Sequence, residues 1–200
     1  MKSRLARRRI AFVAMSAMTI VLLGPALPAN ATNYSGTTGD TGCTGLNEAD
    51  NGSHYFHYVD LSDHMTNATD WARTNNINPT DVNTYYDSTL DNLTDVVVRD
   101  QHYVDYCGKD WMQVPGDGGV VGAAFCDRLN SADECEQHTV RYNLNFTGGT
   151  STDNRRGLAC HEQGHALGLA HRDGSCMEQG YPKPTLNYSS HDRDHLNGNY

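Results

Sequence analysis

The chain has 200 residues, which is enough for one domain with a hydrophobic core, and its formal net charge is −9. The excess of 24 Asp and Glu over 15 Lys and Arg repels phosphate backbones and anionic lipid. Composition therefore argues against nucleic acid and membrane surfaces as partners.

The first 31 residues have the form of a secretory signal peptide. Five basic residues come first, an apolar run from Ile10 to Leu23 follows, and the segment ends in Ala29-Asn30-Ala31. A membrane anchor is the alternative, but the run of roughly 14 residues is shorter than the ~20 that span a bilayer. We predict cleavage after Ala31 and export to the extracellular space. Removing five of the 15 basic residues leaves 10 against 24 acidic ones, a net charge of −14.

The next segments are expected to be a lead-in, a strand and a helix. From Thr32 to about Asn51 the chain is rich in Gly, Thr, Asn and Asp, so we expect a flexible lead-in tied down at Cys43. His54 to Leu61 alternates apolar and polar residues and suits a strand. Asp63 to Asn75 suits an amphipathic helix that Asn78-Pro79 ends. Its apolar residues recur at three- and four-residue spacing: Met65, Ala68, Trp71 and Ala72.

Three more strands are expected in the middle of the chain. Thr94 to Asp100 holds three consecutive valines and is predicted to be a buried strand. A turn at Pro115–Gly119 precedes a strand from Val120 to Phe125, where Gly122 and Ala123 leave room for a close approach. Thr139 to Phe146 alternates again, with Val140, Tyr142, Leu144 and Phe146 on one face.

Two helices complete the predicted α+β domain, which we assign to residues 52–200. Thr152 or Asp153 is expected to cap a helix that runs to about Leu167. The sequence from Ser189 to Asp192 has the form of a capping box before a short last helix that reaches Asn197.

Six cysteines in an exported chain indicate disulfides, and six cysteines allow 15 connectivities. There is no C-x-x-C pair, which argues against a zinc ribbon or a thioredoxin-type redox site. A Cys126–Cys135 bond would close a short polar loop, and a Cys160–Cys176 bond would bracket the histidine motif described next. That pairing leaves Cys43 with Cys107.

The sequence from Cys160 to His171, CHEQGHALGLAH, carries the chemistry. On a helix, residues four apart lie on one face, so His161 and His165 can bind one metal ion. Glu162 follows the first histidine directly and is placed to hydrogen-bond a metal-bound water. The sequence therefore predicts a metal site with a general base beside it.

Two histidines do not complete a tetrahedral zinc site. Gly168 can adopt the left-handed conformation that ends a helix, and the chain would then bring His171 round as the third ligand. Three protein ligands leave the fourth position to water, which is typical of catalytic zinc. We predict Zn²⁺ at His161, His165 and His171.

His161 to His171 resembles the extended zinc signature of the metzincin metallopeptidases, H-E-x-x-H-x-x-G-x-x-H. Met177 stands where those proteins place a methionine beneath the metal, and the tail from Leu186 to Tyr200 is similar to the last helix of matrixin-type members. The resemblance implies a twisted mixed sheet packed on an N-terminal helix and an active-site helix, plus a short C-terminal helix. It also implies a substrate antiparallel to an edge strand, for which Val120–Phe125 is the candidate.

We therefore expect a secreted zinc-dependent endopeptidase with Glu162 as general base. It would be a monomer that acts on protein or peptide substrates. The alternative is a secreted, non-catalytic zinc-binding interaction module, although a structural site does not need the Glu162 carboxylate. Acidic loops could hold structural calcium, but no D-x-D-x-D-G loop is present and no calcium site is assigned. Tyr181 could line the pocket beside the metal, although an exposed loop tyrosine is the commoner explanation for such a residue.

Overall fold

The computed structural model describes residues 43, 45–112 and 119–200, all within one compact unit. The predicted signal peptide lies outside the described residues, and so do most of the predicted lead-in and residues 115–118 of the predicted turn. Within the described ranges, no helix has the length and hydropathy needed to cross a membrane.

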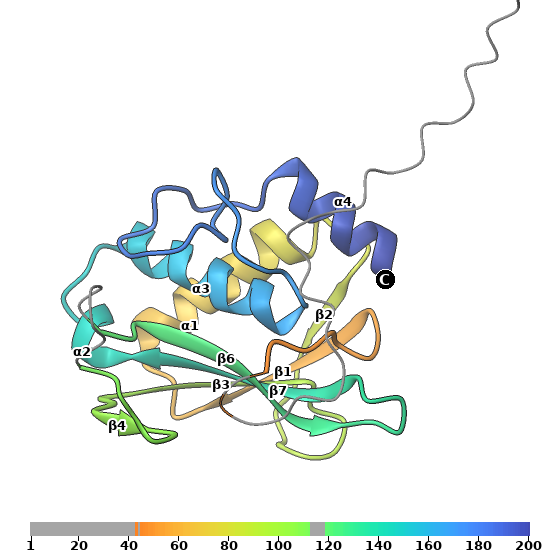
Figure 1. The fold of residues 1–200 in the computed structure, drawn as a ribbon, viewed down its shortest axis with the longest axis horizontal. Helices are drawn as coiled ribbons and strands as arrows, with labels where there is room; N and C mark the ends of the chain where they lie inside the picture. The colour runs from red at the N-terminus through yellow and green to blue at the C-terminus, as the bar shows by residue number, and fades with distance from the viewer. Residues whose placement is uncertain (1–42, 44, 113–118) are drawn as a thin grey trace, which may run out of the picture. The chain divides into compact units, whose positions relative to one another are not determined.

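A five-stranded mixed sheet forms the base of the domain (Figure 1). The strand order is β2-β1-β3-β7-β6, and every neighbouring pair is parallel except β6 with β7. The valine run lies in the central strand β3, where Val96, Val97 and Val98 are all buried, as predicted. The strands are β1 (Ser53–Val59), β2 (Asn83–Tyr86), β3 (Val96–Gln101), β6 (Gly122–Leu129) and β7 (Cys135–Asn143).

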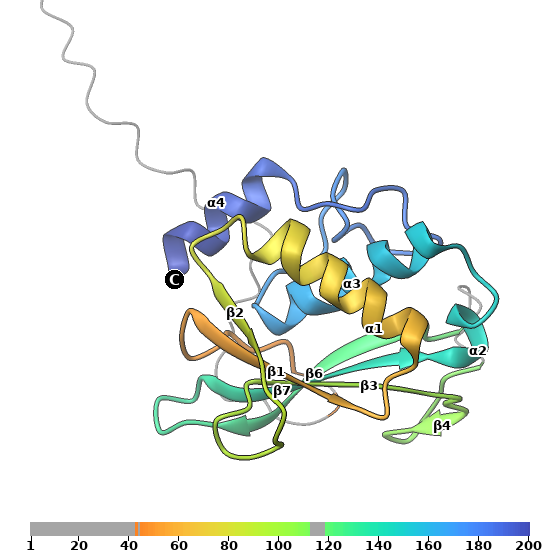
Figure 2. The same cartoon turned by 180° about the vertical axis from the view of Figure 1, so that it is seen from behind.

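Helices cover one face of this sheet (Figures 1 and 2). Helix α1 (Asp63–Ala72) continues through a π-helical turn to Ile77, and it packs against α3 (Thr152–Ala166). Helix α3 also contacts β6 and β7. Helix α4 (Ser190–Asn199) ends the chain and begins with the predicted capping box. The α+β class with a mixed sheet and several helices is therefore confirmed.

Asn143 ends strand β7 earlier than the sequence pattern indicates. Leu144 and Phe146 continue the alternation, but residues Leu144–Thr147 form the short helix α2. The buried Asn143 side chain accepts the Asn145 amide at 3.2 Å and donates to the carbonyls of Tyr103 and Val120. These bonds turn the chain out of the sheet, so the predicted strand end at Phe146 is wrong.

The predicted cap of helix α3 is also corrected. Ser151, rather than Thr152 or Asp153, accepts the backbone amide of Asn154 at 3.2 Å, so Ser151 is the N-cap. Strand β2 and the small hairpin of β4 (Asp105–Tyr106) and β5 (Lys109–Asp110) were not predicted. These strands are short, and they show no alternation in sequence.

All three predicted disulfides are present, which is typical of extracellular proteins: Cys43–Cys107, Cys126–Cys135 and Cys160–Cys176. Residues 45–51 fall within the predicted lead-in, yet Asn47 and Ala49 are buried. The backbone amide of Cys135 donates to the Glu48 carbonyl at 2.8 Å, so this stretch runs along the start of β7. The packed domain therefore begins before residue 52.

Candidate metal centre

Helix α3 places two of the predicted ligands on its buried face. His161 and His165 lie one turn apart, each 5% exposed, with their Nε2 atoms 3.1 Å apart. The amide of Gln163 on the same turn donates to the Thr69 carbonyl of α1 at 3.1 Å. This bond anchors the ligand turn of α3 to the helix beside it.

The third histidine reaches the site through a glycine-dependent turn. Gly168 has φ of +89°, the left-handed conformation predicted for it, and α3 ends just before it. The chain then folds back so that His171 Nε2 lies 3.2 Å from His165 Nε2. His171 itself is exposed, which leaves the site accessible from that side.

The hydrogen bonds of the histidine rings direct their lone pairs into the site. His165 Nδ1 lies 2.7 Å from the Leu169 carbonyl, and His161 Nδ1 lies 2.8 Å from the Cys176 carbonyl. A carbonyl can only accept, so Nδ1 of His165 carries the proton and its Nε2 presents a lone pair. His161 takes the same tautomer when its Nδ1 donates to the Cys176 carbonyl, and Lys183 Nζ lies 2.8 Å from the same nitrogen. Nitrogen lone pairs that face one another repel, and a cation between them removes that repulsion.

Burial keeps these rings neutral. Desolvation, and next the neighbouring His171, lower the pKa of His165 to about 3. Desolvation also lowers the pKa of His161 well below its usual value, with His165 as the next cause. The pKa of the more exposed His171 is lowered too, mainly by burial. A neutral imidazole is the form that binds metal.

The donor set fits a divalent metal ion. The ligand atoms of His161, His165 and His171 all lie within 4.8 Å of one another. Tetrahedral zinc with Zn–N bonds of about 2.0–2.1 Å needs ligand nitrogens roughly 3.3 Å apart. The observed Nε2 separations of 3.1 and 3.2 Å are close to that requirement. These three residues could therefore hold the metal without rearrangement of α3.

Glu162 lies beside the three histidines, against the edge strand β6. A Cβ atom added to Gly122 would lie 2.7 Å from Glu162 Oε1, so the carboxylate occupies the space that this glycine leaves free. The close approach predicted at Gly122 is thus made by Glu162. Glu162 is buried, and desolvation raises its pKa, while the nearby Lys183 lowers it. A carboxyl with a raised pKa can take up and release a proton near neutral pH.

A cavity of about 480 Å³ opens next to these groups. It lies between the Gly119–Gly122 segment, helix α3 and the chain after the third histidine. Tyr181 lines it, so the favoured interpretation of Tyr181 as an exposed loop residue is corrected. Lys183, which sequence reasoning missed, lines it too. The only sequence signal for Lys183 is its position between two prolines, twelve residues after His171.

Met177 packs against helix α3 at Gly164, which lies between the two predicted ligands of that helix. It is fully buried, and a Cβ atom on Gly164 would collide with its side chain, so this helix glycine admits the methionine. The backbone amide of Met177 donates to Ser175 Oγ at 3.1 Å, and Ser175 Oγ in turn donates to Asp192. Asp192 is also the capping-box residue of α4, which links the last helix to the turn beneath the site.

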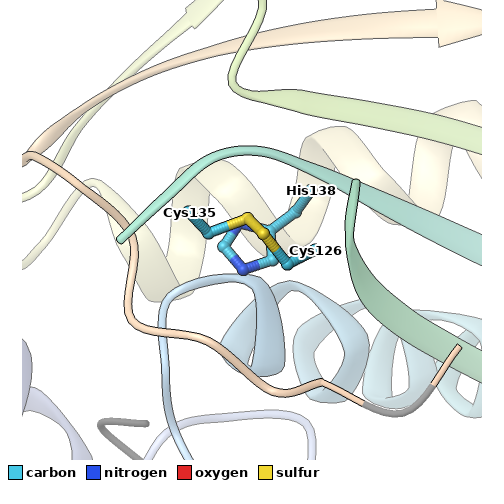
Figure 3. A group of neighbouring side chains, drawn as sticks. All are labelled: Cys126, Cys135 and His138. Atoms are coloured by element: carbon cyan, nitrogen blue, oxygen red, sulfur yellow. A yellow bond between two sulfur atoms is a disulfide. The ribbon is translucent and has the colours of Figure 1, made fainter. Parts of the chain in front are cut away.

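A second group of potential ligands belongs to the structural core. Figure 3 shows Cys126, Cys135 and His138 side by side. The two cysteines are joined in a disulfide, so neither offers the thiolate that binds metal. His138 Nε2 lies 3.2 Å from the Asn47 carbonyl and holds the chain of residues 45–51 in place. We assign no metal to this group.

The search of family models found no match to the sequence, and the search of curated proteins found none either. The resemblance to metzincins therefore depends on the sequence motif alone.

Proposed function

We propose that the protein is a secreted zinc-dependent endopeptidase of the metzincin type. The observation that carries the proposal is the convergence of three histidine Nε2 atoms beside the buried Glu162 carboxylate, at the edge of an accessible cavity. A purely structural zinc site has no use for a buried acid, whose desolvation costs free energy. The acid is the feature that favours an enzyme over a non-catalytic zinc-binding module.

In this proposal the three histidines bind the metal and Glu162 transfers the proton. His161, His165 and His171 hold the metal, which supplies Lewis-acid activation of water and of a peptide carbonyl when bound. Glu162 accepts the proton of the attacking water and passes it to the departing amine. The carboxylate is held between α3 and Gly122, so the scissile bond lies next to strand β6. Strand β6 is an edge strand and can pair with an extended peptide.

The test separates metal binding from turnover. Glu162→Gln should retain one zinc per chain while casein cleavage falls by a factor of about 10² to 10⁴. His165→Ala should lose zinc and cleavage together, and Asp81→Asn, an exposed carboxylate outside the cavity, should behave like the wild type. A stoichiometric zinc protein that cleaves neither casein nor a broad peptide library would instead be the non-catalytic module.

A further inference from the structure

Lys183 places a buried ammonium group in the cavity beside the metal ligands. It is 8% exposed, whereas Lys109, the other lysine in the described part of the chain, is exposed. A Cβ atom on Gly157 would lie 2.6 Å from Lys183 Cβ, so the stem of the lysine packs directly onto α3. The lysine is therefore held at this position by backbone geometry.

The head group has few partners of its own. Lys183 Nζ donates to the Glu178 carbonyl at 2.7 Å and lies 2.8 Å from His161 Nδ1. The Cys176 carbonyl lies at the same Nδ1, and the metal-binding tautomer of His161 gives that proton to the carbonyl. In that tautomer His161 offers no lone pair to the ammonium. Donor capacity on Lys183 then remains for a group in the cavity.

The carboxylates that attract this charge, Glu162 and Glu178, do so from more than 4.0 Å away. Among the described residues, Lys183 forms no ion pair within 4.0 Å. The Glu178 carboxylate accepts the Gly174 amide at 3.1 Å, and Glu162 lies against Gly122. A buried cation without a close counter-ion is costly to the fold. Such a cation in a cavity beside reactive groups is typical of a binding function.

We propose that Lys183 selects peptides that place a carboxylate in this cavity. The inference rests on the proposed peptidase function and names its substrate class. The cavity is lined by three apolar side chains that can contact an aliphatic stem: Val120, Val121 and Leu158. The Lys183 ammonium can bind the carboxylate at the end of that stem. The carboxylate comes either from an Asp or Glu side chain near the scissile bond or from the C-terminus of a short peptide.

The experiment compares matched peptides on zinc-loaded protein. One pair is blocked at both ends and carries Glu or Gln at each position flanking the scissile bond. A second pair has no acidic side chain and ends in a free carboxylate or an amide. Both pairs are measured on wild type, Lys183→Met, Lys183→Arg and Lys109→Met, with zinc content and thermal midpoint as folding controls. Binding of the same peptides to zinc-loaded Glu162→Gln, with and without Lys183→Met, is the readout that does not depend on turnover.

Wild type should favour the carboxylate member of one pair by at least about tenfold in kcat/KM. Lys183→Met should reduce that ratio to within about twofold, while Lys183→Arg and Lys109→Met should preserve it. The pair that responds identifies the source of the carboxylate. Equal ratios in wild type and Lys183→Met, with the peptides cleaved, would overturn the inference. If no peptide is cleaved, the proposed function fails, and the carboxylate preference in binding decides the role of Lys183 separately.

Discussion

Gly122 and Glu162 meet across the boundary between strand β6 and helix α3, with no space for a methyl group between them. A Cβ atom on Gly122 would lie 2.7 Å from Oε1 and 2.9 Å from Cγ of Glu162. The glycine has an ordinary negative φ, so its importance lies in space alone. The edge strand thus sets the position of the proposed general base.

We expect Gly122→Ala to lower kcat by about 10- to 100-fold, because the added methyl group displaces the Glu162 carboxylate. General-base catalysis by such a group contributes a rate factor of about 10² to 10⁴, and part of it would be lost. Zinc content and thermal midpoint should change little, since the end of a glutamate side chain can move. Gly149→Ala is the matched control, because a Cβ atom there meets nothing within 4 Å. Wild-type turnover in Gly122→Ala would show that Glu162 does not need this position.

The Cys160–Cys176 disulfide is expected to support the metal ligands. It joins α3 to the residue whose carbonyl accepts His161 Nδ1–H, and such outer partners contribute about 10- to 100-fold to metal affinity. Replacing both cysteines by alanine should weaken zinc affinity by about tenfold. It should also lower the free energy of unfolding by about 3 kcal/mol, given the sequence separation of 16.

Removal of the Cys126–Cys135 bond is the control for that experiment. Its sequence separation of 9 predicts a stability loss of about 2 to 3 kcal/mol, but it joins β6 to β7 and contacts no predicted ligand. Competition with a fluorescent zinc chelator measures both affinities. The same affinity loss in both variants would assign the effect to general loosening rather than to His161.

The convergence of the three histidines could be predicted from sequence because local geometry decides it. Helical spacing brings His161 beside His165, and a single left-handed residue, Gly168, turns the chain to His171. Lys183 could not be predicted in this way. Its place depends on the contact of its stem with Gly157, which is 26 positions earlier in the sequence, and no local pattern encodes that contact.

The ends of strands and helices show the same limit. The capping box at Ser189 was predicted because both of its partners lie within one turn of α4. The end of β7 was missed because Asn143 bonds to Tyr103 and Val120, which are distant in sequence. A buried polar side chain that satisfies distant backbone groups can override an apolar alternation that continues past it.

Gly164→Ala should destabilise the domain through Met177. The added methyl group would collide with the buried side chain of Met177 and lie 3.2 Å from the ring of Tyr188. We expect a loss of about 1 to 3 kcal/mol in the free energy of unfolding, after the ~1 kcal/mol that alanine gains over glycine in a helix. In denaturant titrations, the loss should shrink when Met177→Ala is already present, because the two side chains compete for one volume. Additive losses would show that Met177 does not fill this space.

Acid sensitivity is expected from the buried His138. Desolvation lowers its pKa to about 4, and the imidazole of His138 in turn lowers the pKa of His54, which is equally buried. In the unfolded chain a histidine takes up a proton near pH 6.5, whereas His138 in the fold does so only near pH 4. Between these values the unfolded state binds more protons, so stability is complete above about pH 6.5 and falls as the pH is lowered. This difference contributes about 2 to 3 kcal/mol of destabilisation by pH 4.

His138→Gln removes the titration but retains a side-chain N–H that can donate to the Asn47 carbonyl, as Nε2 of His138 does at 3.2 Å. The variant should therefore gain stability relative to wild type as the pH falls from 6.5 to 4. Above pH 7 the difference in free energy of unfolding between the two proteins should be constant. His102→Gln, at an exposed histidine, should follow the wild-type curve. The metal ligands also protonate in acid, but they do so in all three proteins, so the difference between curves isolates His138. Parallel curves for wild type and His138→Gln in urea titrations across this range would mean that the imidazole is not held neutral by burial.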